Sequence, residues 1–211
     1  MIGIIDYGLG NVRAFLNCYK DLNVDAEPVS DPDTLDRFSH IILPGVGSFD
    51  EAMTKLEQTK FDQAIRLSLN NGAHLMGVCV GMQVLADSSS EGMMPGLGII
   101  PGRVLKFGDD NSELSIITPH MGWNEVVFDR TQPIFNGFSA EAAEFYFLHS
   151  YYFSPKDSQS AIADTNYKDN FCSAVNSGKV FGFQFHPEKS HGNGRLLLNN
   201  FSKMGVLNAA L

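Results

Sequence analysis

The first half of the chain alternates short apolar runs with longer segments whose apolar residues recur at helical spacing. The runs are short and rich in β-branched or other apolar residues, which is typical of strands buried in a sheet. We therefore expect strands at Ile2–Ile5, Val24–Val29, Ile41–Leu43 and Leu75–Val78.

Helix signals lie between these runs. Asn11 is suited to cap a helix that extends through Leu22, and Ser48 or Asp50 is suited to start the next one. The segment Phe61–Leu69 again has apolar residues at helical spacing. This repeated strand and helix order predicts right-handed crossovers and a largely parallel sheet covered by helices, with ligands near the carboxyl ends of the strands.

From Gly98 onward the residue pattern changes to extended segments interrupted by Gly and Pro. Phe145–Phe153 is one such segment, and Phe171–Phe185 has the pattern of a hairpin that turns near Asn176–Lys179. A final amphipathic segment, Gly194–Met204, predicts a closing helix. The second half therefore predicts mixed or antiparallel strands.

The length of the chain favours one domain over two. Its 211 residues are 44% hydrophobic, which is enough to bury one sizeable core. No internal repeat or low-complexity linker interrupts the sequence. We expect a single domain over residues 1–211.

Charge and apolar content exclude several kinds of partner. Twenty-four acidic and fifteen basic residues give a formal net charge of -9, and no run of Lys or Arg is present, so we expect no nucleic-acid partner. The most apolar stretch, Leu75–Ala86, is too short for a membrane span and contains Gln83. The first residues lack the positive segment of a signal peptide. We expect a soluble protein without membrane association.

The three cysteines, Cys18, Cys79 and Cys172, are widely spaced and form no CxxC pair. An odd, scattered set is typical neither of a disulfide framework nor of a zinc site. A reducing cytoplasmic location fits this usage best.

One of these cysteines stands between two glycines, in Gly77-Val78-Cys79-Val80-Gly81, directly after an apolar strand and before the helical pattern Met82–Asp87. This is the nucleophile-elbow pattern with sulfur in place of a hydroxyl, since flanking glycines allow a sharp turn that exposes the side chain. The N-terminus of the following helix would stabilise a thiolate. The alternative is a small buried core thiol, but the glycine setting favours a nucleophile.

A thiol nucleophile needs a base, and His186 ends an alternating strand in Phe183-Gln184-Phe185-His186-Pro187-Glu188. A carboxylate two residues further on, Glu188, is placed to hold one imidazole tautomer and to stabilise the imidazolium. The alternative is a surface His–Glu pair. Together with Cys79, the pair predicts acyl transfer.

Acyl transfer also needs donors for a developing oxyanion. Leu43-Pro44-Gly45-Val46-Gly47 follows another predicted strand, and the backbone amides of this turn are candidates. The N–H of Val80, next to the candidate nucleophile, is the natural second donor. The alternative is a loop that only connects a strand to a helix.

At this point the motifs GVCVGMQ, PGVGSFD and FHPEKS resemble the class I glutamine amidotransferases, over nearly the whole chain. The resemblance implies an α/β, flavodoxin-like three-layer sandwich with a central, mainly parallel sheet flanked by helices and with added antiparallel strands in the second half. It also implies that a Cys-His-Glu triad hydrolyses glutamine to glutamate and ammonia without a cofactor.

The resemblance assigns roles to particular residues. It implies a triad of Cys79, His186 and Glu188, an oxyanion hole of Val46 or Gly47 with Val80, and a glutamine site around Gln83, Ser150 and Tyr151. Gln83 lies one helical turn after the cysteine, where an amide would reach a substrate. Without the resemblance, Gln83 is better interpreted as a polar residue on a solvated helix face.

More narrowly, DYGLGN, PHMGWN, HSYY and HPEKS resemble the glutaminase subunit of imidazole glycerol phosphate synthase. This implies a heterodimer with a barrel-shaped cyclase subunit that receives ammonia through a tunnel and forms imidazole glycerol phosphate and an aminoimidazole carboxamide ribotide in histidine biosynthesis. Asn11, Trp123 and Lys189 match positions that face this partner. Without the resemblance, Trp123, the only tryptophan, is best interpreted as core packing.

Some segments depart from that pattern. Val80 and Val84 stand where leucines are more usual, and Ser88–Gly92, SAVNSGKVFGFQF and PEKSH resemble a paralogous branch. That branch supplies ammonia to a cyclase-like partner for amidination of a bacterial surface sugar. The alternative acceptor is therefore a sugar of the lipopolysaccharide type.

Other function classes stay open at this stage. GxCxG elbows also serve γ-glutamyl hydrolases and cysteine proteases, although PHMGWN and HPEKS count against both. A non-catalytic subunit is disfavoured because all three triad positions carry competent residues. Gly8-Leu9-Gly10-Asn11 lacks the Lys-Ser/Thr of a phosphate loop and the third glycine of a dinucleotide fingerprint, so no ATP, NAD or metal is expected.

Overall fold

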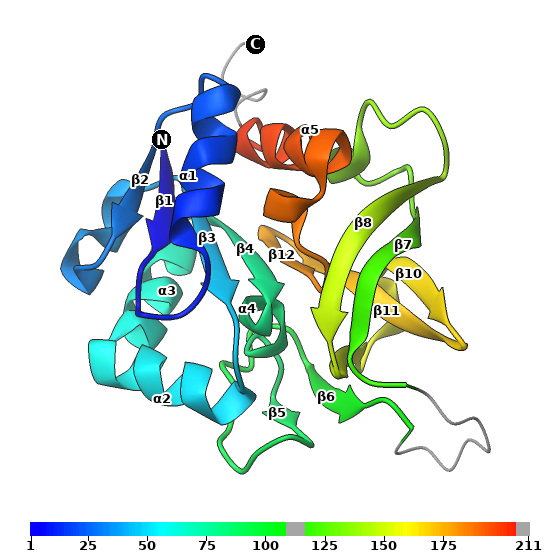
Figure 1. The fold of residues 1–211 in the computed structure, drawn as a ribbon. Helices are drawn as coiled ribbons and strands as arrows, with labels where there is room; N and C mark the ends of the chain where they lie inside the picture. Colours follow the sequence, from blue (N-terminus) through cyan, green and yellow to red (C-terminus); the bar gives the residue numbers. More distant parts are fainter. Residues whose placement is uncertain (109–116, 206–211) are drawn as a thin grey trace.

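The computed structural model describes residues 1–108 and 117–205 (Figure 1). In these residues the chain forms a nine-stranded mixed sheet in the order β2-β1-β3-β4-β12-β11-β10-β7-β8. A second, three-stranded sheet has the order β5-β6-β9. The fold is therefore α/β, with a central sheet flanked by helices.

The strands of the large sheet fall into two groups by direction. The parallel group is β1 (Ile2–Ile5), β2 (Ala26–Val29), β3 (His40–Gly45), β4 (His74–Cys79) and β12 (Val180–Phe183). The antiparallel group is β7 (His120–Phe128), β8 (Ala142–His149), β10 (Ala161–Tyr167) and β11 (Asp169–Ser177). The predicted change from parallel strands in the first half to mixed or antiparallel strands in the second is confirmed.

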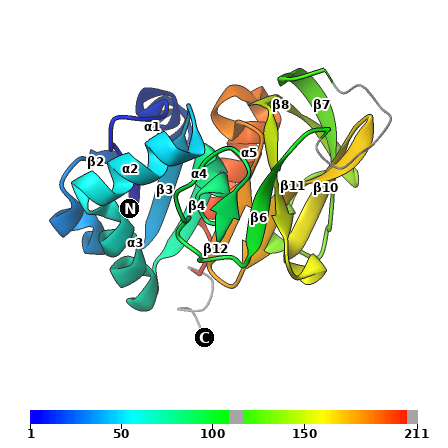
Figure 2. The ribbon, with the colours of Figure 1, turned by 90° about the horizontal axis from the view of Figure 1, so that it is seen from below.

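The small sheet consists of β5 (Ser88–Ser89), β6 (Gly102–Lys106) and β9 (Tyr151–Pro155). Strand β9 packs against β11 and against the short helix α4 (Val80–Gln83). Seen from below, β6 lies in front of the place where the parallel strands give way to the antiparallel ones (Figure 2). The small sheet thus lies over the boundary between the parallel strand β12 and the antiparallel strand β11.

The longer helices are α1 (Val12–Asp21), α2 (Phe49–Thr59), α3 (Phe61–Asn70) and α5 (His191–Ser202). Helix α1 packs against α5, and α2 packs against α3. The connection β1-α1-β2 and the connection β3-α2-α3-β4 run in opposite directions along the sheet, which places their helices on opposite faces when both crossovers are right-handed. Figure 1 shows the two helix pairs on opposite sides of the parallel strands.

Local signals set the helix starts. The Asn11 side-chain oxygen accepts a hydrogen bond from the Ala14 backbone N–H at 3.1 Å, and Ser48 Oγ accepts one from Glu51 N–H at 3.4 Å. Each bond satisfies one of the amides that the first helical turn leaves without an intrahelical partner. The capping residues predicted for α1 and α2 are therefore confirmed. Short 3₁₀ helices are found at Pro32–Arg37, Pro133–Phe135, Ser158–Ser160 and Pro187–Lys189.

The helix predicted over Met82–Asp87 is wrong, because α4 ends at Gln83. The carbonyl oxygens of the following residues accept hydrogen bonds from the amides of Gly96–Ile100 instead of continuing a helical ladder. The Asp87 carboxylate also accepts a bond from Gly102 N–H at 3.0 Å. Tertiary hydrogen bonds thus replace the helix and send the chain into β5.

The continuous extended segment predicted over Phe145–Phe153 is also divided. Strand β8 ends at His149 in the large sheet, and β9 begins at Tyr151 in the small one. Ser150 is the point of transfer between the two sheets. The closing helix begins at His191, three residues before the predicted start, and the hairpin formed by β11 and β12 is confirmed with Ser177 paired to Val180.

Two further observations concern the cysteines and the membrane. Cys18, Cys79 and Cys172 are all free thiols. Within the described ranges, no helix has the length and apolar content that crossing a bilayer requires.

Glycines allow α4 to rest directly on the sheet. A Cβ added at Gly81 would meet the carbonyl oxygen of Leu43 far inside contact distance, and one added at Gly45 would meet the amide of Gly81. Neither φ lies in the left-handed region, so the requirement is close approach of two backbones. The elbow after β4 is held where β3 and β4 lie side by side.

Replacing Gly81 with alanine should therefore lower the free energy of unfolding by about 2 kcal/mol or more, because the obstructing atoms are backbone and cannot rotate away. Urea unfolding followed by circular dichroism measures the change. Gly192→Ala is the matched control, since α5 leaves open space at this position and alanine favours a helix over glycine by roughly 0.5–1 kcal/mol. Equal stability of the wild type and Gly81→Ala would contradict the packing described.

Candidate active site

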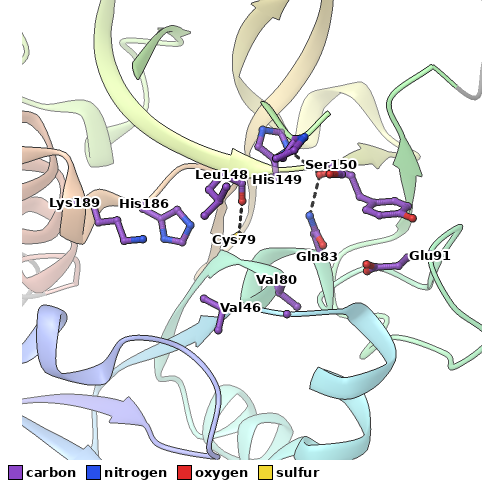
Figure 3. Close-up of a pocket in the computed structure, with 13 residues that line it drawn as sticks. Val46, Cys79, Val80, Gln83, Glu91, Leu148, His149, Ser150, His186 and Lys189 are labelled. Atoms are coloured by element: carbon purple, nitrogen blue, oxygen red, sulfur yellow. Dashed lines mark hydrogen bonds between the residues drawn. The ribbon is translucent and has the colours of Figure 1, made fainter. Parts of the chain in front are cut away.

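A pocket of about 290 Å³ opens at the carboxyl ends of β3, β4 and β12 (Figure 3). This is the edge at which open α/β sheets bind ligands. Its wall is formed by Val46, Gly47, Cys79, Val80, Gln83, Glu91, Pro119, Leu148, His149, Ser150, Tyr151, His186 and Lys189. Residues far apart in the sequence therefore meet around one cavity.

Cys79 is the last residue of β4 and adopts φ 56° and ψ -114°. A side chain at positive φ is strained by roughly 1–3 kcal/mol, and such strain is concentrated at functional turns. The residue is buried, yet its side chain lines the pocket. Its Sγ lies 3.8 Å from the Leu148 carbonyl oxygen and 3.8 Å from Gln184 Nε2. The GxCxG segment therefore forms a strained strand-to-helix elbow whose thiol faces the cavity.

His186 and Glu188 follow β12 and form a buried pair. His186 Nδ1 lies 2.8 Å from Glu188 Oε1, and the side chains are only 4% and 2% exposed. This burial excludes the alternative of a surface His–Glu pair. Because a carboxylate only accepts from the imidazole, Nδ1 carries the hydrogen and Nε2 is left for the thiol.

The charge state of His186 follows from these contacts. Burial alone would lower its pKa, but hydrogen bonds with Cys79 and Glu188 and the charges of both groups raise the pKa to about 9. The imidazole is therefore protonated at neutral pH, beside the thiol and the carboxylate. A positively charged neighbour favours the thiolate form of a cysteine, which is its nucleophilic form.

The candidate oxyanion residues lie on the opposite wall. Val46 and Gly47 follow β3, with Gly47 at φ +90°, and Val80 follows the cysteine directly. All three border the cavity that contains the Cys79 side chain. The structure thus brings them together with the thiol, and their role as donors stays a prediction.

Gln83 lies inside the protein, so its interpretation as a residue of a solvated helix face is wrong. It is 3% exposed, and its Nε2 donates to the Tyr151 carbonyl oxygen at 2.9 Å and to Gln184 Oε1 at 3.0 Å. Both hydrogens of this amide are used in these bonds. Gln83 can therefore meet a ligand only as an acceptor, through Oε1, while Ser150 and Tyr151 form the adjacent wall.

Glu91 lines the pocket, although its segment Ser88–Gly92 gave no sequence signal for a binding role. Its Oε2 accepts a hydrogen bond from Phe49 N–H at 2.8 Å, at the start of α2. In return the Asp50 carboxylate accepts from Met93 N–H at 2.9 Å and from Met94 N–H at 3.1 Å. The loop after β5 is thus tied to α2, and it presents a carboxylate to the cavity.

The three residues matched to a partner-facing surface have different surroundings. Asn11 is exposed and caps α1. Trp123 is 46% exposed, so its interpretation as core packing is wrong, and its ring stacks on His191 with centroids 5.1 Å apart. Lys189 lies at the pocket wall with Nζ 5.5 Å from the centroid of the Tyr146 ring.

Comparisons with known proteins agree with this geometry. A family model described as glutamine amidotransferase class-I matches residues 3–204. The chain is 45% identical over 205 residues to the imidazole glycerol phosphate synthase subunit HisH of Leptospira borgpetersenii, covering 97% of this chain and 100% of that one. It is 44% identical over 205 residues to the HisH subunit of Bdellovibrio bacteriovorus, again covering 97% and 100%.

Solved structures support the fold. PurLQS from Thermotoga maritima matches with a TM-score of 0.74 and 21% identity, covering 99% of this chain and 97% of that chain. The glutaminase domain of CTPS from Trypanosoma brucei matches with a TM-score of 0.65 and 16% identity, covering 99% and 93%. At these identities the likeness concerns the arrangement of sheet and helices alone.

The His186 contacts predict a titration that nuclear magnetic resonance can measure. In the wild type its imidazole should titrate near pH 9, and the pKa should fall in Glu188→Gln, which removes the carboxylate charge. A folded-state pKa above the unfolded value of about 6.5 stabilises the fold. This contribution is fully present below that unfolded value and is lost as the pH rises through the folded pKa.

Glu57→Gln is the matched control, because this exposed glutamate of α2 lies outside the pocket wall. It should leave the titration of His186 unchanged. A wild-type His186 that titrates at an ordinary imidazole pKa would overturn the ion-pair description.

Proposed function

The chain belongs to the class I glutamine amidotransferases, and on that premise we propose that it hydrolyses glutamine to glutamate and ammonia, as the glutaminase subunit of imidazole glycerol phosphate synthase. The observation that carries this proposal is the buried His186–Glu188 pair set against the strained Cys79 elbow in one pocket. Cys79 is the nucleophile, His186 transfers protons, and Glu188 orients and charges the imidazole.

The first half-reaction uses the thiolate and the imidazolium. Cys79 Sγ attacks the side-chain amide carbon of glutamine, and the amide oxygen becomes an oxyanion held by the Val80 N–H and by an N–H of Val46 or Gly47. His186 Nε2 gives its proton to the amide nitrogen. The carbon–nitrogen bond breaks, ammonia leaves, and a thioester joins the glutamyl group to Cys79.

The second half-reaction restores the enzyme. The neutral His186 takes a proton from water as that water attacks the thioester carbon. The carbon–sulfur bond breaks and glutamate leaves with the added oxygen. The thiolate and the imidazolium are restored, so glutamine and water have become glutamate, ammonia and the proton that the new carboxyl group releases.

Recognition of glutamine rests on charge placement around the cavity. The α-ammonium group of the substrate is bound by the Glu91 carboxylate, whose position is fixed by its bond to Phe49 N–H. Gln83 Oε1 is a further acceptor beside it, and Ser150 and Tyr151 form the wall against which the substrate backbone lies. An acceptor set of this kind discriminates against ligands that lack the ammonium group.

A partner surface borders the pocket. Met121 pairs with Leu148 across β7 and β8, and Trp123 pairs with Tyr146 two residues further along. The side chains of Val46, Met121, Trp123 and Leu148 are large, apolar and exposed, and they are 39–66% accessible. Exposed apolar side chains that gather beside a ligand cavity mark a protein interface.

The partner proposed for this surface is the cyclase subunit, in a heterodimer that also covers Asn11 and Lys189. Sealing the cavity keeps ammonia from being protonated in open water before it reaches the cyclase. The acceptor is then the ribotide that yields imidazole glycerol phosphate and an aminoimidazole carboxamide ribotide. The relatives described above carry the name of that synthase, which favours it over the surface-sugar alternative.

The first test is glutamate release from glutamine by the wild type, alone and with the cyclase subunit plus its ribotide substrate. Cys79→Ala should reduce release by at least about 10³-fold, as loss of a nucleophile does in related triads. Cys172→Ala is the control, because this thiol is buried on β11 outside the pocket. Release should rise sharply with the cyclase, and release that is independent of Cys79 would refute the mechanism.

A second test concerns the substrate ammonium. Glu91→Gln removes the charge but keeps the shape, so the KM for glutamine should rise by roughly 10-fold or more, as expected for loss of a charge-assisted hydrogen bond. Glu57→Gln serves as the control outside the pocket. An unchanged KM in Glu91→Gln would place the ammonium elsewhere.

A further inference from the structure

Two buried histidines beside the pocket are used by none of the steps above. His120 of β7 and His149 of β8 are cross-strand partners, 3% and 6% exposed. His120 Nδ1 lies 2.9 Å from His149 Nε2, and His149 Nδ1 lies 2.8 Å from the carbonyl oxygen of Tyr151. His149 also lines the pocket. The pair thus joins two strands of the large sheet to the first residue of β9.

The carbonyl oxygen fixes the direction of these bonds. It can only accept, so His149 Nδ1 carries the hydrogen and its Nε2 is an acceptor. His120 Nδ1 must then donate, which makes its own Nε2 an acceptor for Asn124 Nδ2 at 3.2 Å. The chain runs from Asn124 through His120 and His149 to Tyr151, with one tautomer allowed for each ring.

The inner end of the chain reaches the nucleophile. The Tyr151 carbonyl oxygen accepts from Gln83 Nε2 as well as from His149, at 2.9 Å and 2.8 Å. The same Gln83 nitrogen donates to Gln184, whose Nε2 lies 3.8 Å from Cys79 Sγ. Figure 3 shows Gln83 and His149 directed toward the same part of the β8–β9 connection.

The surroundings of the pair keep it neutral. His120 stacks between Phe147 and Tyr167, with ring centroids 4.6 Å and 4.0 Å away, and Phe107 lies 5.3 Å from His149. Burial lowers the pKa of His120 to about 4 and that of His149 to about 3. An apolar ring would fill this space without needing any hydrogen bond, so the polar chain has a purpose other than packing.

The outer end of this hydrogen-bonded chain lies behind the proposed partner surface. Along β7, Met121 and Trp123 are exposed, whereas His120 and Asn124 lie on the other face of the strand. The same strand therefore carries apolar side chains of the partner surface on one face and the histidine of the hydrogen-bonded chain on the other.

We propose that His120 is a positioning residue, which acts through His149 to hold the Ser150–Tyr151 wall of the glutamine pocket against Gln83. The proposal rests on the proposed function, since the wall it positions is the wall of the glutamine site. His120 touches neither the substrate nor the nucleophile. Its effect is on substrate binding, and it links β7 to the pocket.

The test compares His120→Phe with His120→Gln. Phenylalanine fills the space between the Phe147 and Tyr167 rings but offers no donor, so His149 Nε2 loses its partner. The KM for glutamine should then rise about 10-fold, which is the cost of one buried unpaired acceptor. The kcat with a competent cyclase should change far less. Glutamine has an amide that donates to His149 and an oxygen that accepts from Asn124, so His120→Gln should restore most of the lost affinity.

Tyr167→Phe is the matched control. It alters the ring that stacks on His120 and removes the bond from Tyr167 Oη to the Ile117 carbonyl oxygen, but it leaves the chain intact. The KM should stay at the wild-type value. Equal KM values for His120→Phe and the wild type, or equal increases in His120→Phe and Tyr167→Phe, would overturn the proposal.

A second measurement is independent of activity. Nitrogen-15 spectra of the wild type should show neutral His120 and His149, each protonated at Nδ1. In His120→Phe, His149 should stay protonated at Nδ1, but its Nε2 resonance should shift because this nitrogen loses the hydrogen bond from His120. A different wild-type tautomer at His149 would refute the proposal even if His120→Phe failed to fold. A wild type with these tautomers but no glutaminase activity would refute the proposed function, while the hydrogen-bonded chain from Asn124 to Tyr151 would still be demonstrated.

Discussion

The contact between α4 and the backbone of β3 is the constraint on which the site depends. Gly81 and Gly45 have no side chains, so the first turn after Cys79 rests directly on the neighbouring strand. That support holds Cys79 in a backbone conformation that would otherwise relax, because a side chain at positive φ is unfavourable. The thiol therefore faces the cavity as a consequence of the packing of two backbones. Helix α4 spans only Val80–Gln83, so it supports the elbow through its contact with β3 and not through its length.

The second half of the chain supplies what the elbow lacks. Strand β12 inserts beside β4 in parallel register, with Phe183 opposite Val78, and so delivers His186 to the same edge as Cys79. The antiparallel strands then extend the sheet, and the departure of the chain from β8 at Ser150 brings a second wall to the cavity. The parallel strands β4 and β12 position the nucleophile and its base, and the antiparallel strands supply a second wall of the pocket, which explains the mixed sheet.

Sequence patterns predicted the parts of this arrangement that local rules govern. Short apolar runs located the parallel strands, Asn11 and Ser48 marked helix starts, and glycines around Cys79 marked the elbow. Glu91 and His149 were assigned no role, although the segments Ser88–Gly92 and His149–Tyr152 contain them. A carboxylate in a loop and a histidine in a strand have no periodic signal. Their roles arise from partners remote in sequence, such as Phe49 for one and His120 for the other. The overlong helix predicted after Cys79 failed for the same reason, since carbonyl groups found tertiary donors.

The pocket also contains two histidines with different charge states, a protonated His186 and a neutral His149. His186 meets a carboxylate and a thiol, and their hydrogen bonds and charges outweigh burial. His149 meets a carbonyl oxygen and another imidazole, neither of which compensates a positive charge as a carboxylate does, so burial prevails and the ring stays neutral. A second imidazolium at His149 would compete for the thiolate and would repel the substrate ammonium. Pairing His149 with His120 instead of an acid therefore keeps this imidazole neutral, and His186 is the imidazole of the pocket that carries a positive charge beside Cys79.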